Sequence, residues 1–157
     1  MKTKIILLCL VMLSATANLF ANNDPDPKNV AAYNSLIRDY INCHMTGDAK
    51  NLNRILDENA SYKIPRGEKV MLQGKSKLVE QMRKENGIQQ NCQSDYQILA
   101  ASDAMVIAKV DFTYGDCLQS NYVIMEKSAD KVWKITQVCK FFGDVKSAAL
   151  TQPVASK

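Results

Sequence analysis

The sequence has little histidine: His44 is the single one in the chain. It also lacks any CxxC motif, so a structural zinc site would have to be assembled from scattered positions. Cys43 directly precedes His44, but neighbouring residues of a helix are turned by about 100° from each other. The two side chains therefore do not form one dyad or chelate one metal, and no cofactor or metal site is predicted.

The sequence also lacks an apolar run long enough to cross a bilayer, which needs about 20 residues. Its longest one, from Ile5 to Leu13, follows Lys2 and Lys4 and precedes small residues. This pattern is typical of a secretory signal peptide over residues 1–21, with cleavage after Ala17 or Ala21. Leu8 stands before Cys9, where a lipoprotein signal has a small residue. We therefore expect an exported protein, periplasmic or secreted, with no membrane anchor after cleavage.

Clustered positive charge is absent as well. The chain has 20 basic and 16 acidic residues, so the loss of Lys2 and Lys4 with the signal leaves a net charge of +2. The basic residues lack the aromatic interleaving and the arginine clusters of a nucleic-acid groove. Nucleic acid is therefore not an expected partner.

Helical signals fill the first half of the remaining chain. Residues 22–29 are polar and contain proline, which predicts a flexible leader. From Val30 to His44, apolar residues recur at helical spacing, and Gly47 ends the pattern. Asp48 is a typical N-cap for a short second helix. A hairpin is predicted around residues 65–68, and a third helix from Gly74 to Gly87.

From Cys92 onward the pattern changes to strands. Four runs of strand length, separated by short polar turns, predict an antiparallel meander over residues 92–142, followed by a flexible tail over 143–157. Strict alternation puts Asp111 on the outer face of its strand. In the last strand it groups Trp133, Ile135, Gln137, Cys139 and Phe141 on the inner face. The order of elements predicts an α+β fold, with three helices packed into the concave face of a curved, mostly antiparallel sheet.

Four cysteines follow the predicted signal, an even number in a compartment where disulfides persist. If the turn at residues 101–103 aligns Ile98 with Val106, Cys92 opposes Phe112, and Cys117 lies just past that strand. This register favours a Cys92–Cys117 disulfide and leaves Cys43 and Cys139 as the second pair. Three pairings are possible in all, and buried reduced thiols are a further alternative.

Two stretches resemble a known superfamily. "YNSLIRDYINCHMTGDAKNLNRILDENASYKIPRG" is similar to the opening of nuclear transport factor 2-like proteins, which include the SnoaL-like and ketosteroid isomerase branches. "SDAMVIAKVDF" and "NYVIMEKSADKVWKITQVCKFF" resemble the closing strands, most of all those of the bacterial group named "Putative lumazine-binding". The resemblance covers residues 30–142. It implies a cone with an internal pocket, often paired as a homodimer through the outer sheet face, but it implies no reaction.

Ketosteroid isomerases of this superfamily use an aspartate general base just before a Pro-x-Gly. Here the matching position in "KIPRG" is Ile64, which cannot move a proton. Tyr33 or Tyr40 could serve as the hydrogen-bond donor of that family, but a donor without a base does not perform the reaction.

The predicted pocket combines one helical face with two strands. Tyr33, Ile37, Tyr40 and His44 share a helical face, which is either a pocket wall or an ordinary core face. Tyr96, Trp133 and Gln137 share strand faces with apolar residues. The favoured hypothesis is a non-catalytic exported protein that binds a small apolar or aromatic molecule. The alternative is an isomerase or dehydratase with His44 as general acid or base, oriented by a tyrosine or by Asp95. A third is a protein-interaction domain that uses the outer sheet face.

Overall fold

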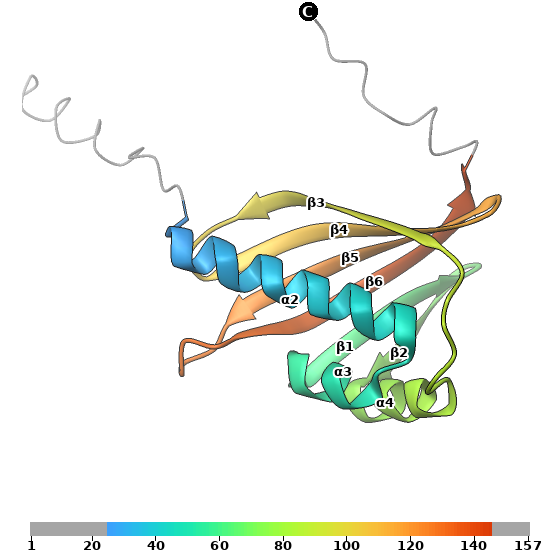
Figure 1. Ribbon diagram of the computed structural model, residues 1–157, viewed down its shortest axis with the longest axis horizontal. Coiled ribbons are helices and arrows are strands. Elements are labelled where there is room, and N and C mark those ends of the chain that lie inside the picture. Colours follow the sequence, from blue (N-terminus) through green and yellow to red (C-terminus); the bar gives the residue numbers. More distant parts are fainter. Residues whose placement is uncertain (1–24, 146–157) are drawn as a thin grey trace, which may run out of the picture.

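A computed structural model describes residues 25–145 as a curved sheet with helices on one side of it (Figure 1). The predicted signal peptide, residues 22–24 of the predicted leader and residues 146–157 of the predicted tail lie outside the described residues. The helices are α2 (Pro27–Thr46), α3 (Ala49–Ile55) and α4 (Lys75–Lys84). The strands are β1 (Leu56–Arg66), β2 (Lys69–Gly74), β3 (Gln93–Ala101), β4 (Met105–Tyr114), β5 (Cys117–Lys127) and β6 (Trp133–Asp144).

The long helix α2 begins at Pro27, three residues before the predicted start at Val30. The Asp26 side chain caps it by accepting a hydrogen bond from the Lys28 amide at 2.8 Å, and proline suits the first helical position. The carboxylate of Asp103 accepts further hydrogen bonds from the Asp26 amide and the Asn29 side chain. The last residues of the predicted flexible leader are therefore helical and held by the β3–β4 turn.

The "TGD" sequence joins α2 to α3. Gly47 ends α2 in the left-handed region, with a φ of 69°, and its amide donates to the Cys43 carbonyl. The Asp48 side chain accepts from the Asn51 amide and caps α3, as predicted. A Cβ at Gly47 would lie against the backbone oxygen of Glu85 and 2.9 Å from its carbonyl carbon. Only glycine therefore lets the chain after α4 pass this close to the end of α2.

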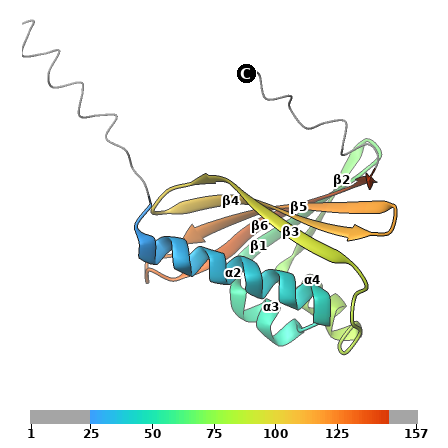
Figure 2. The same cartoon turned by 45° about the horizontal axis from the view of Figure 1, so that its top comes forward.

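Six strands form one mixed sheet in the order β2-β1-β6-β5-β4-β3. All neighbours are antiparallel except β1 and β6, which run parallel. Figures 1 and 2 show all three helices on the same side of the sheet, with α2 lying across it. The predicted α+β fold, with helices packed into one face of a mostly antiparallel sheet, is confirmed.

Two register predictions were wrong. Ile98 pairs with Ala108 instead of Val106, because β3 continues to Ala101 before it turns and Leu99 forms a bulge. In β6, Gln137 pairs with Ile124 and Ile135 with Met125, so Thr136 is an extra residue in the strand. Such a bulge reverses the side-chain alternation beyond it. Val138 and Lys140 consequently face the helices, and Gln137, Cys139 and Phe141 face outward.

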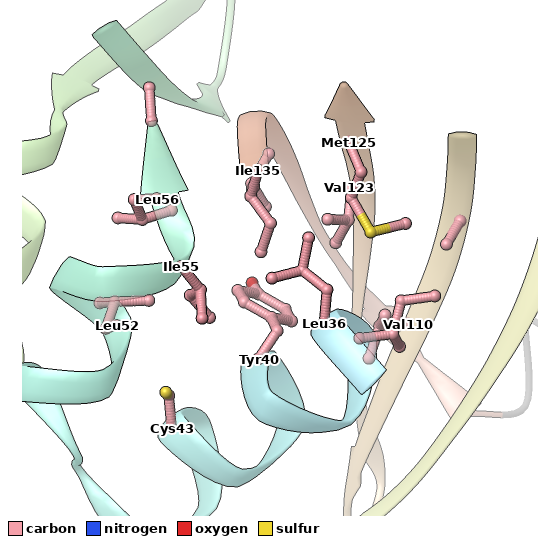
Figure 3. Close-up of a cluster of buried hydrophobic side chains, with 14 of the residues drawn as sticks. Leu36, Tyr40, Cys43, Leu52, Ile55, Leu56, Val110, Val123, Met125 and Ile135 are labelled. Carbon is pink, nitrogen blue, oxygen red and sulfur yellow. The ribbon is translucent and has the colours of Figure 1, made fainter. Parts of the chain in front are cut away.

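The core lies between α2, α3 and the inner sheet face (Figure 3). Alternation in β4 brings Val106, Ala108, Val110 and Phe112 inward, as predicted, and each is fully buried. Figure 3 shows Leu36, Tyr40 and Cys43 of α2 among side chains of α3 and the central strands. Within residues 25–145, no helix has both the length and the apolar character to cross a membrane.

Gly47→Ala is expected to lower the free energy of unfolding by about 2 kcal/mol or more, because an L-residue there is strained and its Cβ meets the Glu85 backbone. Gly67→Ala is the matched control, since Gly67 also has a positive φ but no atom within 4 Å of the added Cβ. Urea unfolding of both variants measures the difference. Equal losses for the two would contradict the close contact between the α2–α3 turn and Glu85.

Candidate functional site

A partly enclosed cavity of about 280 Å³ lies between the end of α2, α4 and the inner sheet face. The loop after α4 closes one side, because the Gln90 amide donates to the Met45 carbonyl at 2.8 Å. The wall combines hydroxyl, amide, imidazole, ammonium and carboxylate groups with three apolar side chains. The lining residues are Tyr40, His44, Leu52, Tyr62, Leu78, Gln81, Met82, Glu85, Gln90, Tyr114, Gln119 and Lys140.

Two of the predicted pocket residues, Tyr40 and His44, line this cavity. Tyr33 and Trp133 instead pack edge to face in the core, with ring centroids 5.8 Å apart. Ile37 is fully buried in the same core. The predicted helical face of α2 therefore divides along its length. Its first two residues pack in the core, and its last two, Tyr40 and His44, line the cavity.

The other two predicted strand residues, Tyr96 and Gln137, also lie outside the cavity wall. The Tyr96 hydroxyl donates to Asn34 on α2 at 3.2 Å. Gln137 lies beyond the β6 bulge on the outer face, where it accepts a hydrogen bond from Lys63 at 2.9 Å. The prediction that Gln137 lines the pocket was wrong, because the alternation from Trp133 does not continue through Thr136.

His44 is the first chemically distinctive group of the cavity. Its Nε2 lies 2.6 Å from the Tyr114 hydroxyl, and its ring lies against Phe112 with centroids 3.9 Å apart. Burial lowers the pKa of His44 to about 4, and the positive charge of Lys140 adds to this effect. The imidazole is therefore neutral at pH 7 and serves as a hydrogen-bonding group.

A chain of side-chain hydrogen bonds reaches the cavity from β5. The Gln119 amide donates to Asn121 at 3.2 Å, and the fully buried Asn121 amide donates to the Tyr40 hydroxyl at 2.8 Å. Burial raises the pKa of Tyr40 and Tyr62 far above the usual tyrosine value, so both hydroxyls stay protonated. This network fixes the orientation of Tyr40 and satisfies a buried amide that would otherwise be costly.

Lys140 is the cationic side chain of the cavity wall, and the sequence pattern misses it. The Thr136 bulge turns it inward, where its Nζ lies 5.9 Å from the centroid of the Tyr62 ring. Burial lowers the pKa of Lys140, while the charge of Glu85 opposes that shift. Within residues 25–145, the Lys140 ammonium has neither an ion pair within 4.0 Å nor a hydrogen-bond acceptor.

Asp95, the carboxylate predicted as a possible partner of His44, does not face the cavity. Asp95 pairs with Asp111 across β3 and β4, and both lie on the outer side of the sheet. There, Asp111 accepts hydrogen bonds from Lys109 and Ser120, as its predicted outward direction requires. Asp95 therefore cannot orient His44. Ile64, in place of the isomerase base, is a buried side chain of β1.

The predicted disulfides are absent: Cys43, Cys92, Cys117 and Cys139 are free thiols. Cys43 is on the buried face of α2, and the β6 bulge puts Cys139 on the opposite side of the sheet. Cys117 pairs with Tyr114 on one side of β4, and Cys92 directly precedes β3, which pairs with the other side of β4. Two strand spacings of about 4.8 Å exceed the roughly 7 Å that a disulfide allows between Cα atoms. Cys92 instead contacts Met45, at 3.4 Å between sulfurs.

Within residues 25–145, no group of three or more His, Cys, Asp and Glu side chains is arranged so that it could hold a metal ion. The side chains that line the cavity supply neutral hydrogen-bonding groups, one ammonium, one carboxylate and aromatic rings. Polar groups that converge on one concave space beside apolar side chains are a feature of small-molecule sites, and in this cavity the polar groups predominate.

The fold and the cavity define a nuclear transport factor 2-like protein. Residues 28–142 match the family model described as "Putative lumazine-binding", so the chain belongs to that family. This agrees with the resemblance found in the sequence. Among curated proteins, no relative matches the chain.

Solved structures of low sequence identity share the fold. An NTF2-like protein of unknown function from Silicibacter pomeroyi is 12% identical, with a TM-score of 0.63 over 74% of this chain and 97% of its own. One from Methylobacillus flagellatus is 16% identical, with a TM-score of 0.61 over 77% and 97%. A ketosteroid isomerase-like protein from Erwinia carotovora atroseptica is 12% identical, with a TM-score of 0.55 over 76% and 98%. At these identities the likeness shows the fold alone.

The imidazole of His44 is expected to titrate near pH 4, and a single histidine gives one resolvable proton NMR signal. The unfolded chain takes up this proton near pH 6.5 and the folded chain only near pH 4. Stability should therefore fall as the pH drops through that window, by about 3 kcal/mol from this residue. His44→Gln should remove that part of the pH dependence. A histidine midpoint at pH 6 or above would contradict the buried, neutral site.

The four thiols should differ in reactivity with iodoacetamide. Cys117 is exposed and should react first, whereas burial raises the pKa of the Cys43 thiol to about 12 and should make it react last. Peptide mapping without reductant measures both the order and the number of labelled thiols. A linked peptide pair containing any two of the four would contradict the arrangement of β3, β5 and β6.

Proposed function

We propose that the protein is exported and binds a small molecule in the cavity without catalysing a reaction. The observation that carries this proposal is the lining itself. Tyrosine hydroxyls, amides and one ammonium converge on a space that Leu52, Leu78 and Met82 border with apolar surface. Membership in a family described as lumazine-binding supports a ligand-binding fold. The signal-like first 21 residues support export.

The cavity suits a compact ligand. Its volume of about 280 Å³ lies just below the range of about 300–1,000 Å³ that drug-sized ligands occupy. Tyr40 and Tyr62 line the cavity with protonated hydroxyls but are almost fully buried, whereas the rings of His44 and Tyr114 are partly exposed. A one- or two-ring molecule with polar substituents matches these walls.

The lack of a placed general base favours binding over catalysis. Ile64 stands where ketosteroid isomerases have their base, and Asp95 lies on the far side of the sheet. His44 is near Tyr114, but an imidazole with a pKa of about 4 is a weak base at pH 7. The groups of this wall hold and orient a ligand better than they move its protons.

The enzyme alternative has one observation in its favour. His44 faces the cavity and has a hydroxyl within hydrogen-bond reach, which is the geometry that a His–Tyr acid–base pair needs. An isomerase or dehydratase of this kind would lose activity by at least about 100-fold in His44→Gln, the usual contribution of one acid–base group. A ligand recovered unchanged after incubation with the protein would speak against this alternative.

A homodimer through the outer sheet face stays a prediction. Val70, Leu72 and Phe141 are exposed on that face, next to charged pairs such as Lys109 with Asp111. A second copy would cover these apolar side chains. The same exposed surface would serve the interaction-domain hypothesis. Neither a homodimer nor a protein-interaction domain requires a ligand in the cavity.

Native mass spectrometry of protein purified from the exported fraction should show a retained small molecule and report the subunit number. Met82→Trp places a larger side chain at the cavity wall and should abolish retention. Met105→Trp is the matched control, because Met105 is exposed and does not line the cavity. Equal retention by both variants, or a wild-type protein that is empty and binds no member of a fragment library, would overturn the proposal.

A further inference from the structure

We propose that the ligand is a small aromatic monocarboxylate and that Lys140 binds its carboxylate group. This inference rests on the proposed binding function and adds the charge and chemical class of the ligand. It depends on the position of one ammonium group, on the acids that could neutralise it and on the aromatic surfaces around it.

The backbone of β6 directs Lys140 into the cavity. Lys140 pairs with Asn121 of β5, and Asn121 is fully buried and bonded to Tyr40. Side chains of directly opposed strand residues share a face, so Lys140 must point to the same side as Asn121. Its Nζ lies over the Tyr62 ring, where a cation is attracted to the aromatic face.

Glu85, the one acidic side chain among the lining residues of the described chain, acts on this charge only at longer range. Glu85 lines the rim and is exposed, and it makes no ion pair with Lys140 within 4.0 Å. By contrast, Lys75, the buried lysine of α4, is bonded to the Glu58 carboxylate at 2.6 Å and to the Leu56 carbonyl. Lys140 is half-buried, so its ammonium keeps some contact with solvent but lacks a protein partner among the described residues, and an anionic ligand would supply one.

The other lining groups are neutral and select for shape and hydrogen bonding. Among the lining residues of the described chain, Lys140 is the only cation. It can pair with one negative charge of a ligand, and a second negative charge would have no cationic partner. The partly exposed rings of His44 and Tyr114 line the cavity together with Lys140, beside the almost fully buried Tyr40 and Tyr62. Aromatic rings stack favourably on such surfaces, which favours an aromatic body next to the carboxylate. The exposed Glu85 carboxylate at the rim disfavours ligands with further negative charges.

The inference is tested with pairs of probes that differ only in charge. A panel of aromatic carboxylates from benzoate to 2-naphthoate is titrated at pH 7, each beside its primary amide, with acetate as an anion that lacks a ring. Backbone NMR shifts of the cavity residues report the site, and calorimetry reports the affinity. At least one carboxylate is expected to bind at least 10-fold more tightly than its amide and than acetate.

Variants assign the charge preference to Lys140. Lys140→Met keeps the aliphatic stem and should weaken the carboxylate at least 10-fold while leaving the amide unchanged. Lys140→Arg should retain the preference. Lys69→Met, at an exposed position of the β1–β2 hairpin outside the cavity wall, should change neither affinity. Thermal unfolding of each variant checks that it is folded, and the arginine variant decides the question if the methionine variant is not.

The outcomes separate this inference from the proposed function. Two results would overturn the inference of an anionic ligand: amides that bind as tightly as the carboxylates, or a carboxylate affinity that Lys140→Met does not change. Either result would still support the proposed function, because the probes would bind in the cavity. Acetate as tight as the best aromatic carboxylate would overturn the aromatic part of the assignment. If no probe shifts any cavity residue at millimolar concentration, this inference is overturned, whereas the proposed function is overturned only by an empty protein that also binds no member of the fragment library.

Discussion

One extra residue in β6, Thr136, determines which chemistry the interior of this protein contains. Before it, Trp133 and Ile135 face inward and complete the core; after it, Val138 and Lys140 do. Without the bulge, Gln137 and Cys139 would face the helices, and the ammonium of Lys140 would be in solvent. This bulge places Lys140, the one cation among the lining residues of the described chain, at the cavity, and it places the thiol of Cys139 on the outer face.

The opposite wall depends on a second close fit. Gly47 lets the backbone of Glu85 pass against the turn between α2 and α3, and the amide of Gln90 then bonds to Met45. This contact holds the loop after α4 over the last turn of α2, where His44 and Tyr40 reach the cavity. Hydrogen bonds from Gln119 through Asn121 fix Tyr40 from the sheet side. The cavity is thus shaped mainly by backbone geometry, and its side chains are oriented by buried polar contacts.

Local patterns predicted the elements well, because periodicity and caps are local properties. The strand face from Val106 to Phe112, the N-cap Asp48 and the role of Gly47 all follow from neighbouring residues. Tyr40 and His44 were found in the same way. Lys140, Tyr62 and Glu85 were missed, because their meeting depends on a bulge and on a loop that crosses from another element. The Cys92–Cys117 prediction failed because β4 lies between β3 and β5, and the Cys43–Cys139 prediction failed because the β6 bulge turns Cys139 outward.

The direction of the Lys140 side chain is the central claim, and through-space NMR contacts measure it without any ligand. The bulge predicts nuclear Overhauser contacts from the Lys140 methylene protons to the ring of Tyr62, on the inner face. It also predicts contacts from the Cys139 β-protons to the ring of Tyr122, its partner on the outer face. Contacts between Lys140 and the Tyr122 ring, with none to Tyr62, would show an uninterrupted strand and contradict the account.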